Sequence, residues 1–363
     1  VAALATVFAY RLECFTPSEM NQIGAIGFLV EFESLLSTHG SENGMLGDFA
    51  AACFALNQTR LVVVKDMGDV PTGAHEIFYE KVEGCGSSTY DPVVRSFGVS
   101  RVIVDDGEKK SSSLHLIFQV TAAVYEVLPK SMKMDDISKN EEEGQQTMAG
   151  VSVTSVMFSQ GINEMQTMAN AMGKFSIQED INICSFHRLQ TYFEKYKHWC
   201  KDMKVLPPGR SGGDPFFSTP EAEYSRRKWV EVFEEFDIRL EGIRTTIREA
   251  HGQGKKSFMI LTETAALVRD LNGSRCTSCK SAKDRTGMSV TLEQARLLAD
   301  NHSLGCDSLA AERCVMLMRA HGTRLENSWK NIQKRCFAFN SFQLMNLPKI
   351  YRPPISVTGG CPS

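Results

Sequence analysis

Five residues separate a cysteine from an arginine in the segment Cys279-Lys280-Ser281-Ala282-Lys283-Asp284-Arg285. A loop of this length can place a thiolate and a guanidinium on one phosphate group, with backbone N–H groups aimed at the remaining oxygens. Residues 274–278 predict a short buried strand before the loop, and residues 287–300 predict a helix after it. The start of such a helix favours a bound anion and lowers the pKa of the cysteine. A strand, a phosphate-binding loop and a helix in this order predict an α/β fold.

Two lysines, Lys280 and Lys283, add positive charge to this loop. Arg285 and the loop amides already balance one phosphate dianion, so the surplus indicates a substrate that carries several phosphates. The alternative is that both lysines face the solvent, as most lysines do. We expect Lys280, Ser281, Ala282 and Lys283 to form the substrate-binding part of the loop.

The loop residues also suggest a mechanism in two steps. The Cys279 thiolate attacks phosphorus to form a phosphocysteine, which water then hydrolyses. Arg285 holds the equatorial phosphate oxygens and stabilises their charge in the transition state. Thr286 either donates a hydrogen bond to the departing thiolate or only caps the following helix.

The proton donor for the leaving alkoxide has two candidates. Asp284 would lie beside the bound dianion, which raises the pKa of a carboxyl and suits a general acid. It could instead stay ionised and orient Arg285 or a lysine. Asp214 is the second candidate, on a loop rich in Pro and Gly where an aspartate is usually a turn residue.

The loop and the residues that follow it, Met288 to Gln294, resemble the signature of the inositol polyphosphate 4-phosphatases of types I and II. Bacterial effector phosphoinositide phosphatases carry a similar loop, and myotubularin and Sac-type loops have an aspartate at the place of Asp284. The similarity is clearest over residues 150–355. Supporting segments are Leu35 to Gly40, Gly161 to Glu164 with Gln166-Thr167, Ala338 to Ser341, and Tyr351 to Pro354.

This resemblance implies removal of the 4-phosphate from phosphatidylinositol 3,4-bisphosphate to give phosphatidylinositol 3-phosphate, without a metal or cofactor. It also implies a substrate in a membrane surface and a cytoplasmic protein attached peripherally to endosomal or plasma membranes. Members of the family carry a lipid-binding C2 domain, so we expect membrane recruitment to need a domain outside this chain.

Two alternatives stay open. One is a phosphatase of the same fold that acts on soluble inositol phosphates or on phosphoproteins. The other is a non-catalytic phosphoinositide-binding module, which is disfavoured because Cys279 and Arg285 are both intact.

Composition agrees with a folded chain. Of the 363 residues, 42% are hydrophobic and 23% are charged, as in ordinary globular proteins. The net charge of −3 gives no general attraction to nucleic acid, and no apolar run approaches the roughly 20 residues of a membrane span.

The eleven scattered cysteines predict reduced thiols. Cys184, His187, His198 and Cys200 do not have the spacing of a zinc finger, and we expect no metal.

We expect two regions in the chain. Residues 1–145 predict an amino-terminal accessory α+β region, and residues 146–363 predict a dual-specificity-like, cysteine-dependent phosphatase domain with a central sheet flanked by helices. The charged segment 133–146 is the expected boundary. Strands are expected at 61–64, 101–104, 114–118 and 151–158; helices are expected at 17–37, 163–172, 181–201, from 219 onward, and at 257–271.

A few further residues near the loop invite competing interpretations. Cys276 is either a small buried hydrophobic residue on the strand or a redox partner for Cys279. Lys255-Lys256 and the cluster 226–228 could contact substrate, although such charges usually lie on solvated faces. Arg352 could meet substrate or tether the end of the chain.

Overall fold

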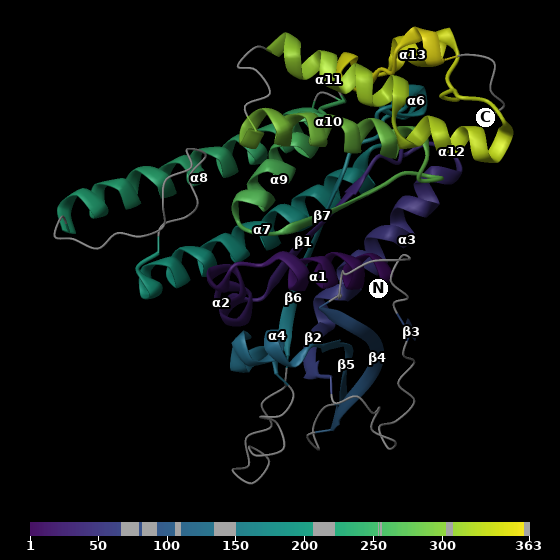
Figure 1. Cartoon of the computed structure of the whole chain (residues 1–363). Coiled ribbons are helices and arrows are strands. Elements are labelled where there is room, and N and C mark those ends of the chain that lie inside the picture. The colour runs from purple at the N-terminus through teal and green to yellow at the C-terminus, as the bar shows by residue number, and fades with distance from the viewer. Residues whose placement is uncertain are drawn as a thin grey trace.

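A central sheet organises the protein (Figure 1). The computed structural model describes residues 1–66, 80–81, 93–105, 110–133, 150–205, 222–252, 254, 256–302 and 308–358. Within these ranges, seven strands form one sheet in the order β3-β4-β5-β2-β6-β1-β7. The strands are β1 (Phe28–Ser34), β2 (Thr59–Lys65), β3 (Glu80–Lys81), β4 (Val94–Asp105), β5 (Lys110–Val120), β6 (Val151–Ser159) and β7 (Ser274–Ser278). β1 pairs in parallel with both β6 and β7, whereas β2 is antiparallel to β6.

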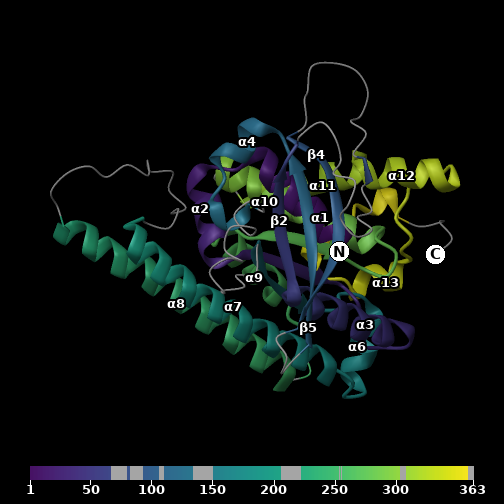
Figure 2. The same cartoon turned by 90° about the horizontal axis from the view of Figure 1, so that it is seen from below.

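Helices cover both faces of this sheet. They are α1 (Ala2–Cys14), α2 (Pro17–Ile26), α3 (Ser41–Ala55), α4 (Ala122–Val127), α6 (Glu164–Ala171), α7 (Ser176–Met203), α8 (Ala222–Gly252), α9 (Met259–Asp270), α10 (Asp284–His302), α11 (Ser308–His321), α12 (Thr323–Ile332) and α13 (Ser341–Asn346). Figure 2 shows α7 and α8 packed side by side. The expected α/β class, with a central sheet flanked by helices, is confirmed.

The two faces of the sheet belong to different hydrophobic cores. Along β6, Val156 and Phe158 enter the core built mainly with α7, α8 and α9. Val153 and Met157 point the other way, into the core built with α1, α2 and α3. This alternation follows from the two-residue period of a strand, and it makes β6 and β1 the buried centre of the molecule.

The helix expected over residues 17–37 is wrong in its second half. α2 ends at Ile26, and β1 begins two residues later, with every one of its residues buried. Gly27 makes the break: its φ is +101°, and a Cβ there would lie 2.8 Å from the carbonyl oxygen of Ser152. β1 opens with the apolar run Phe28 to Val30, and hydrophobic periodicity cannot separate so short a run from the end of a buried helix.

The other expected elements that fall on described residues are present, with β2, β4, β5, β6, α6, α7 and α9 at the expected places. The helix after the loop begins at Asp284 rather than at Gly287, so Arg285 is itself helical. The start of the helix expected from residue 219 and the boundary expected near residue 145 lie outside the described residues. Strands from both sides of that boundary join the same sheet.

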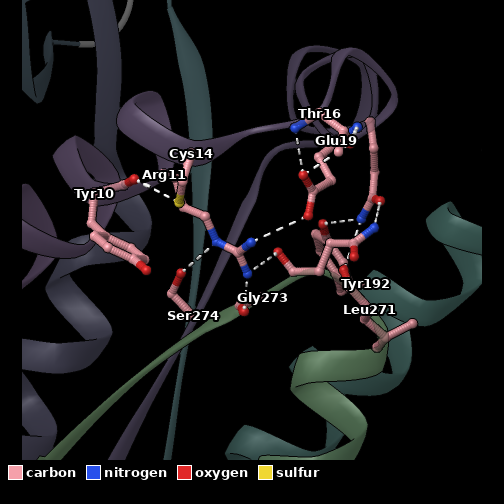
Figure 3. Close-up of polar contacts among 11 residues, drawn as sticks. Tyr10, Arg11, Cys14, Thr16, Glu19, Tyr192, Leu271, Gly273 and Ser274 are labelled. Atoms are coloured by element: carbon pink, nitrogen blue, oxygen red, sulfur yellow. Dashed lines mark hydrogen bonds and ion pairs between the residues drawn. The ribbon is translucent and has the colours of Figure 1, made fainter. Parts of the chain in front are cut away.

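The start of β7 is fixed by a side chain from the first helix (Figure 3). Arg11 of α1 donates from Nε to Ser274 Oγ at 3.2 Å and from Nη2 to the carbonyl oxygen of Gly273 at 2.8 Å. The same guanidinium pairs with Glu19 at 3.3 Å. One arginine thus ties α1 and α2 to the strand that leads into the loop.

A buried charge network joins β7 to the helix on the other side of the loop. Arg275 of β7 forms an ion pair with Glu33 of β1, which also accepts a hydrogen bond of 2.7 Å from Ser289 of α10. Arg275 pairs with Glu293 of α10 as well, at 3.3 Å. The strand before the loop and the helix after it are therefore held by the same set of charges.

Three further findings concern the rest of the described chain. None of the helices in the described ranges is long and apolar enough to cross a membrane. Cys184, His187, His198 and Cys200 all lie on α7, and no group of three or more His, Cys, Asp or Glu side chains within the described residues could hold a metal ion. Cys336 is disulfide-bonded, so the expectation of reduced cysteines is wrong at this position.

Candidate active site

The loop between β7 and α10 surrounds the sulfur of Cys279 with hydrogen-bond donors. Thr286 donates from Oγ1 to Sγ at 3.2 Å, and the backbone N–H groups of Ser281 and Thr286 also donate to it. Burial alone would raise the pKa of this thiol, but these three donors, together with the charge of Arg285, lower the pKa below its usual value. The fraction of thiolate at neutral pH is thereby larger than for an ordinary cysteine.

The tip of the loop turns through a left-handed residue. Ala282 has a φ of +47°, a conformation that costs a residue with a Cβ about 1–2 kcal/mol. Lys280, Ser281, Ala282 and Lys283 are all exposed, and neither lysine takes part in an ion pair with a described residue. The four residues expected to bind substrate thus face outward beside the half-buried sulfur.

The guanidinium of Arg285 is held by an acid that the sequence analysis did not identify. Glu42, in the first turn of α3, accepts two hydrogen bonds from it, at 2.9 and 2.5 Å. Arg285 also donates to the carbonyl oxygen of Leu35 at 2.7 Å. Both side chains are buried, so this two-point contact fixes the plane of the guanidinium.

Electrostatics strengthens this pair. Burial works against both charges, yet the hydrogen bonds and charge of Arg285 hold the pKa of Glu42 below its usual value, helped by the N–H of Ser37. Burial likewise opposes the charge on Arg285, but Glu42 and the Cys279 thiolate raise the pKa of the guanidinium. The site therefore holds the Arg285–Glu42 ion pair before any phosphate arrives.

Asp284 is engaged away from the sulfur. Arg324 of α12 donates from Nε to Oδ1 at 2.6 Å, and the N–H of Ala338 donates to Oδ2 at 3.4 Å. Neither contact involves Arg285 or a loop lysine, which were the expected partners of an ionised Asp284. In this arrangement the carboxylate connects the loop to α12 and to the segment before α13.

Two segments singled out in the sequence form one wall of the site. Gln166 of α6 accepts from the N–H of Thr38 at 3.1 Å and donates to Thr38 Oγ1 at 3.1 Å, which joins α6 to the turn after β1. Glu164, at the start of α6, lies near enough to Arg285 to raise the pKa of the guanidinium. Gln343 of α13 donates to Glu164 at 2.9 Å. The turn after β1 and the start of α6 thus meet near Arg285, and Gln343 is bonded to Glu164 at the edge of this wall.

Cys276 and Cys279 lie on opposite faces of the sheet. Cys276 packs against the core of α1, α2 and α3, whereas Cys279 packs against the core of α7, α8 and α9. Burial raises the pKa of the Cys276 thiol to about 11, which makes it a poor nucleophile. The structure therefore favours the small buried hydrophobic residue over the redox partner.

The remaining basic candidates have structural partners or lie outside the described residues. Lys256 donates from Nζ to the carbonyl oxygens of Asn163 at 2.6 Å and Asn346 at 3.2 Å, and burial lowers its pKa to about 8. Arg352 donates to the carbonyl oxygens of Leu347 and Met345, so it tethers the end of the chain. Asp214, Lys255 and the side chains of 226–228 fall outside the described residues.

A family model described as the INPP4A C-terminal domain matches residues 119–211 and 234–351 of this chain. The chain belongs to this family. The match to the INPP4A C-terminal domain includes the whole loop and the residues that hold Asp284, but it begins after β1 and Glu42.

Two similar curated proteins are named as inositol phosphatases, and a third is named as a Rac exchanger. Inositol polyphosphate 4-phosphatase type II of Homo sapiens is 31% identical over 365 residues, which is 99% of this chain and 31% of that protein. Type II inositol 3,4-bisphosphate 4-phosphatase of Rattus norvegicus is 32% identical over 348 residues, 94% of this chain and 29% of that protein. The human phosphatidylinositol 3,4,5-trisphosphate-dependent Rac exchanger 2 protein is 24% identical over 334 residues, 87% of this chain and 17% of that protein. The chain spans about a third of the length of the two phosphatases.

Proposed function

We propose that this chain is the catalytic part of a phosphoinositide 4-phosphatase, which converts phosphatidylinositol 3,4-bisphosphate to phosphatidylinositol 3-phosphate through a phosphocysteine. The observation that carries the proposal is a thiol with a lowered pKa beside an arginine that Glu42 fixes at two points. The names of two relatives give the 4-position and the 3,4-bisphosphate. The proposal includes a cysteine-dependent phosphatase fold for the sheet and the helices around the loop.

In the first step the Cys279 thiolate attacks the 4-phosphorus, the bond from phosphorus to the inositol oxygen breaks, and the alkoxide takes a proton. Arg285 holds the equatorial oxygens throughout, and the N–H groups of the loop and the start of α10 supply further donors. In the second step water attacks phosphorus and the thiolate leaves. Thr286, 3.2 Å from the sulfur, stabilises the thiolate at both ends of this cycle.

Lys280 and Lys283 give the proposed substrate its class. Both are exposed on the loop without an ion pair among the described residues, so they are available to a second phosphate. Because a monophosphate would leave these cations without a role, a bisphosphate suits the loop better than a phosphotyrosine.

Asp284 remains the proposed proton donor, and it must exchange a partner before it can act. The carboxylate accepts from Arg324 and from the N–H of Ala338, so binding of a phosphate dianion would have to loosen one of these contacts. The test is Asp284→Asn on two substrates. We expect turnover of the inositol lipid to fall about 100-fold, the scale of general acid catalysis. Turnover of p-nitrophenyl phosphate, whose leaving group needs no proton, should change little. Equal losses on both substrates would contradict the acid role.

The proposed function is tested with short-chain phosphoinositides, soluble inositol phosphates and a phosphotyrosine peptide, in the presence of EDTA. We expect phosphate release from the 3,4-bisphosphate lipid, with the 3-phosphate as product. Cys279→Ser should abolish the release, whereas Cys276→Ala, on the strand before the loop and packed against the other core, should keep it. Release from the peptide alone, or release that survives in Cys279→Ser, would overturn the proposal.

Family membership by itself does not decide between an enzyme and a binding module. One relative is named as a Rac exchanger that depends on the 3,4,5-trisphosphate, not as a phosphatase. The catalytic proposal therefore depends on this chain's own Cys279, Arg285 and Glu42. The same assay is therefore repeated with a reductant and paired with a measurement of lipid binding. If the chain binds the 3,4-bisphosphate without releasing phosphate, the binding module is correct.

Peripheral attachment to a membrane follows from the proposed substrate. We extend the proposal to the cytoplasmic face of endosomal or plasma membranes, with recruitment assisted by a domain outside this chain.

A further inference from the structure

An apolar rim lies beside the loop, on two helices that pack against each other. It consists of Met168 and Met172 at the end of α6, with Phe342 and Met345 of α13. Their exposed fractions are 45%, 54%, 62% and 68%. Figures 1 and 2 both show α6 and α13 close together, and the two helices are in contact. We call these four side chains the apolar rim.

Hydrogen bonds place this rim next to the catalytic loop. The N–H of Ala338, three residues before α13, donates to Asp284, which directly follows Lys283 in the chain. From the other side, Gln343 of α13 donates to Glu164, whose charge acts on Arg285. α13 is therefore joined to the loop on one side and to the wall of the site on the other.

The rim and the loop together have the composition of a surface that enters a lipid interface. Lys280 and Lys283 are exposed cations without ion pairs to described residues. Exposed Phe and Met side chains next to such cations combine burial of apolar area with attraction to anionic headgroups. An open hollow of about 630 Å³ lies beside the rim, and Met345 lines it together with Thr167 and Lys256.

We propose that the apolar rim, with Lys280 and Lys283, is the surface by which this chain docks on an anionic membrane, an inference that rests on the proposed phosphoinositide phosphatase function. Docking in this orientation turns the mouth of the loop toward the headgroups. The lysines attract the surface, and the rim enters the headgroup layer and holds the chain there.

The test compares a rim variant with a matched control. The rim variant is Phe342→Ser/Met345→Ser. The control is Val127→Ser on α4, because Val127 is 68% exposed, as Met345 is, and α4 lies at the opposite end of the sheet in Figure 1. Each protein, with and without Cys279→Ser, is sedimented with phosphatidylcholine vesicles containing phosphatidylserine and the 3,4-bisphosphate lipid. Phosphate release is measured on these vesicles and on the soluble dibutanoyl form of the same lipid.

We expect the rim variant to lose vesicle binding and vesicle turnover at least about tenfold, since the loss of two apolar contacts weakens insertion. Its turnover of the soluble lipid should match that of the unmodified chain, and Val127→Ser should match it in all three measurements. Vesicle binding that is unchanged in the rim variant, or an equal loss in Val127→Ser, would overturn the docking surface. A chain without turnover of the soluble lipid whose binding still depends on the rim would instead contradict the proposed enzyme.

Discussion

At Cys279, three hydrogen-bond donors act on one sulfur, and one of them can be removed without disturbing the backbone. Thr286→Val deletes the hydroxyl that lies 3.2 Å from Sγ and keeps the shape of the side chain. A donor to a thiolate lowers the pKa of the thiol, so its loss raises that pKa.

We expect the pH midpoint of alkylation of Cys279 by iodoacetamide to move upward by up to about one unit in Thr286→Val. At neutral pH the alkylation rate should fall accordingly. Thr286→Ser, which keeps the hydroxyl, serves as the control and should retain the midpoint. If the midpoint does not move, the Thr286 hydroxyl does not stabilise the thiolate, and Thr286 serves only as a residue of the helix.

Glu42 is a positioning residue, because it acts on phosphate only through Arg285. Glu42→Gln keeps the size of the side chain but leaves Arg285 one neutral acceptor, because the amide NH2 cannot accept a hydrogen bond from the guanidinium. A hydrogen bond to a charged group contributes about 1.5–3 kcal/mol. We expect kcat to fall about tenfold to hundredfold.

Inhibition by tungstate should weaken by a similar factor in Glu42→Gln, since the anion needs the same orientation of Arg285. Asp48→Asn, an exposed acid on the same helix, is the matched control. If Glu42→Gln lowers the melting temperature but leaves kcat and tungstate inhibition unchanged, the role of Glu42 is structural.

At the scale of the elements, α10 depends on one buried arginine from its neighbour α11. Arg319 is 2% exposed and donates from Nη2 to the carbonyl oxygens of Met288 and Ile350, both at 2.8 Å. It also donates to Thr291 and to the carbonyl oxygen of Arg352. The helix that begins in the catalytic loop is thereby tied to the end of the described chain.

Replacing Arg319 by Met would leave several buried acceptors without donors. Each such group costs about 1–3 kcal/mol, so we expect Arg319→Met to lower the free energy of unfolding by roughly 3 kcal/mol or more. Urea denaturation followed by circular dichroism measures this change. Arg313→Met, at an exposed position of α11, should stay within about 0.5 kcal/mol of the original chain. If Arg319→Met and Arg313→Met have similar free energies of unfolding, Arg319 does not hold α10 in place.

The elements differ in how far the sequence reveals them. β7, the loop and α10 follow each other directly, so local spacing predicted their order and the place of Cys279 and Arg285. β1 was missed because its first three residues are all apolar and the alternation that follows, from Val30 to Glu33, covers only four residues. Gly27, directly before Phe28, was the sign in the sequence that the helix ends and a strand begins.

Glu42 was missed for a different reason. Its partner Arg285 is 243 residues away, and no local pattern connects the two positions. The partner of Asp284, Arg324, is likewise supplied by a separate helix. The reactive residues of the loop could thus be predicted from the sequence. The side chains that orient them depend on which helices pack beside the loop in the fold.

Over the whole molecule, a carboxyl at the centre of the sheet makes stability depend on pH. Glu31 is completely buried on β1 and accepts a hydrogen bond of 2.7 Å from Thr264. Burial raises its pKa from 4.5 to about 7, although the charge of Arg275 and the bond from Thr264 act in the opposite direction. Between these two values the folded chain keeps a proton that the unfolded chain has released.

Stability should therefore fall as the pH rises from about 4.5 to about 7, and it should level off above that range. In Glu31→Gln this fall is absent. The variant's free energy of unfolding, relative to the original chain, should thus increase between pH 5 and pH 8 by an amount on the order of 3 kcal/mol. Urea denaturation at both pH values measures it, with the exposed Glu312→Gln as the control. If the difference in free energy of unfolding between Glu31→Gln and the original chain is the same at pH 5 and pH 8, the pKa of Glu31 is not raised.

The place of β1 between β6 and β7 also has a consequence for biosynthesis. A ribosome releases residues 28–34 long before it has made residues 151–159 and 274–278, the two neighbours of that strand. During this interval a strand destined for complete burial has open edges, which are templates for pairing with other chains. The loop is held by Glu42 only when Arg285 has emerged, so assembly of the site is a late event in translation. Chains stopped before residues 274–278 keep one edge of β1 unpaired.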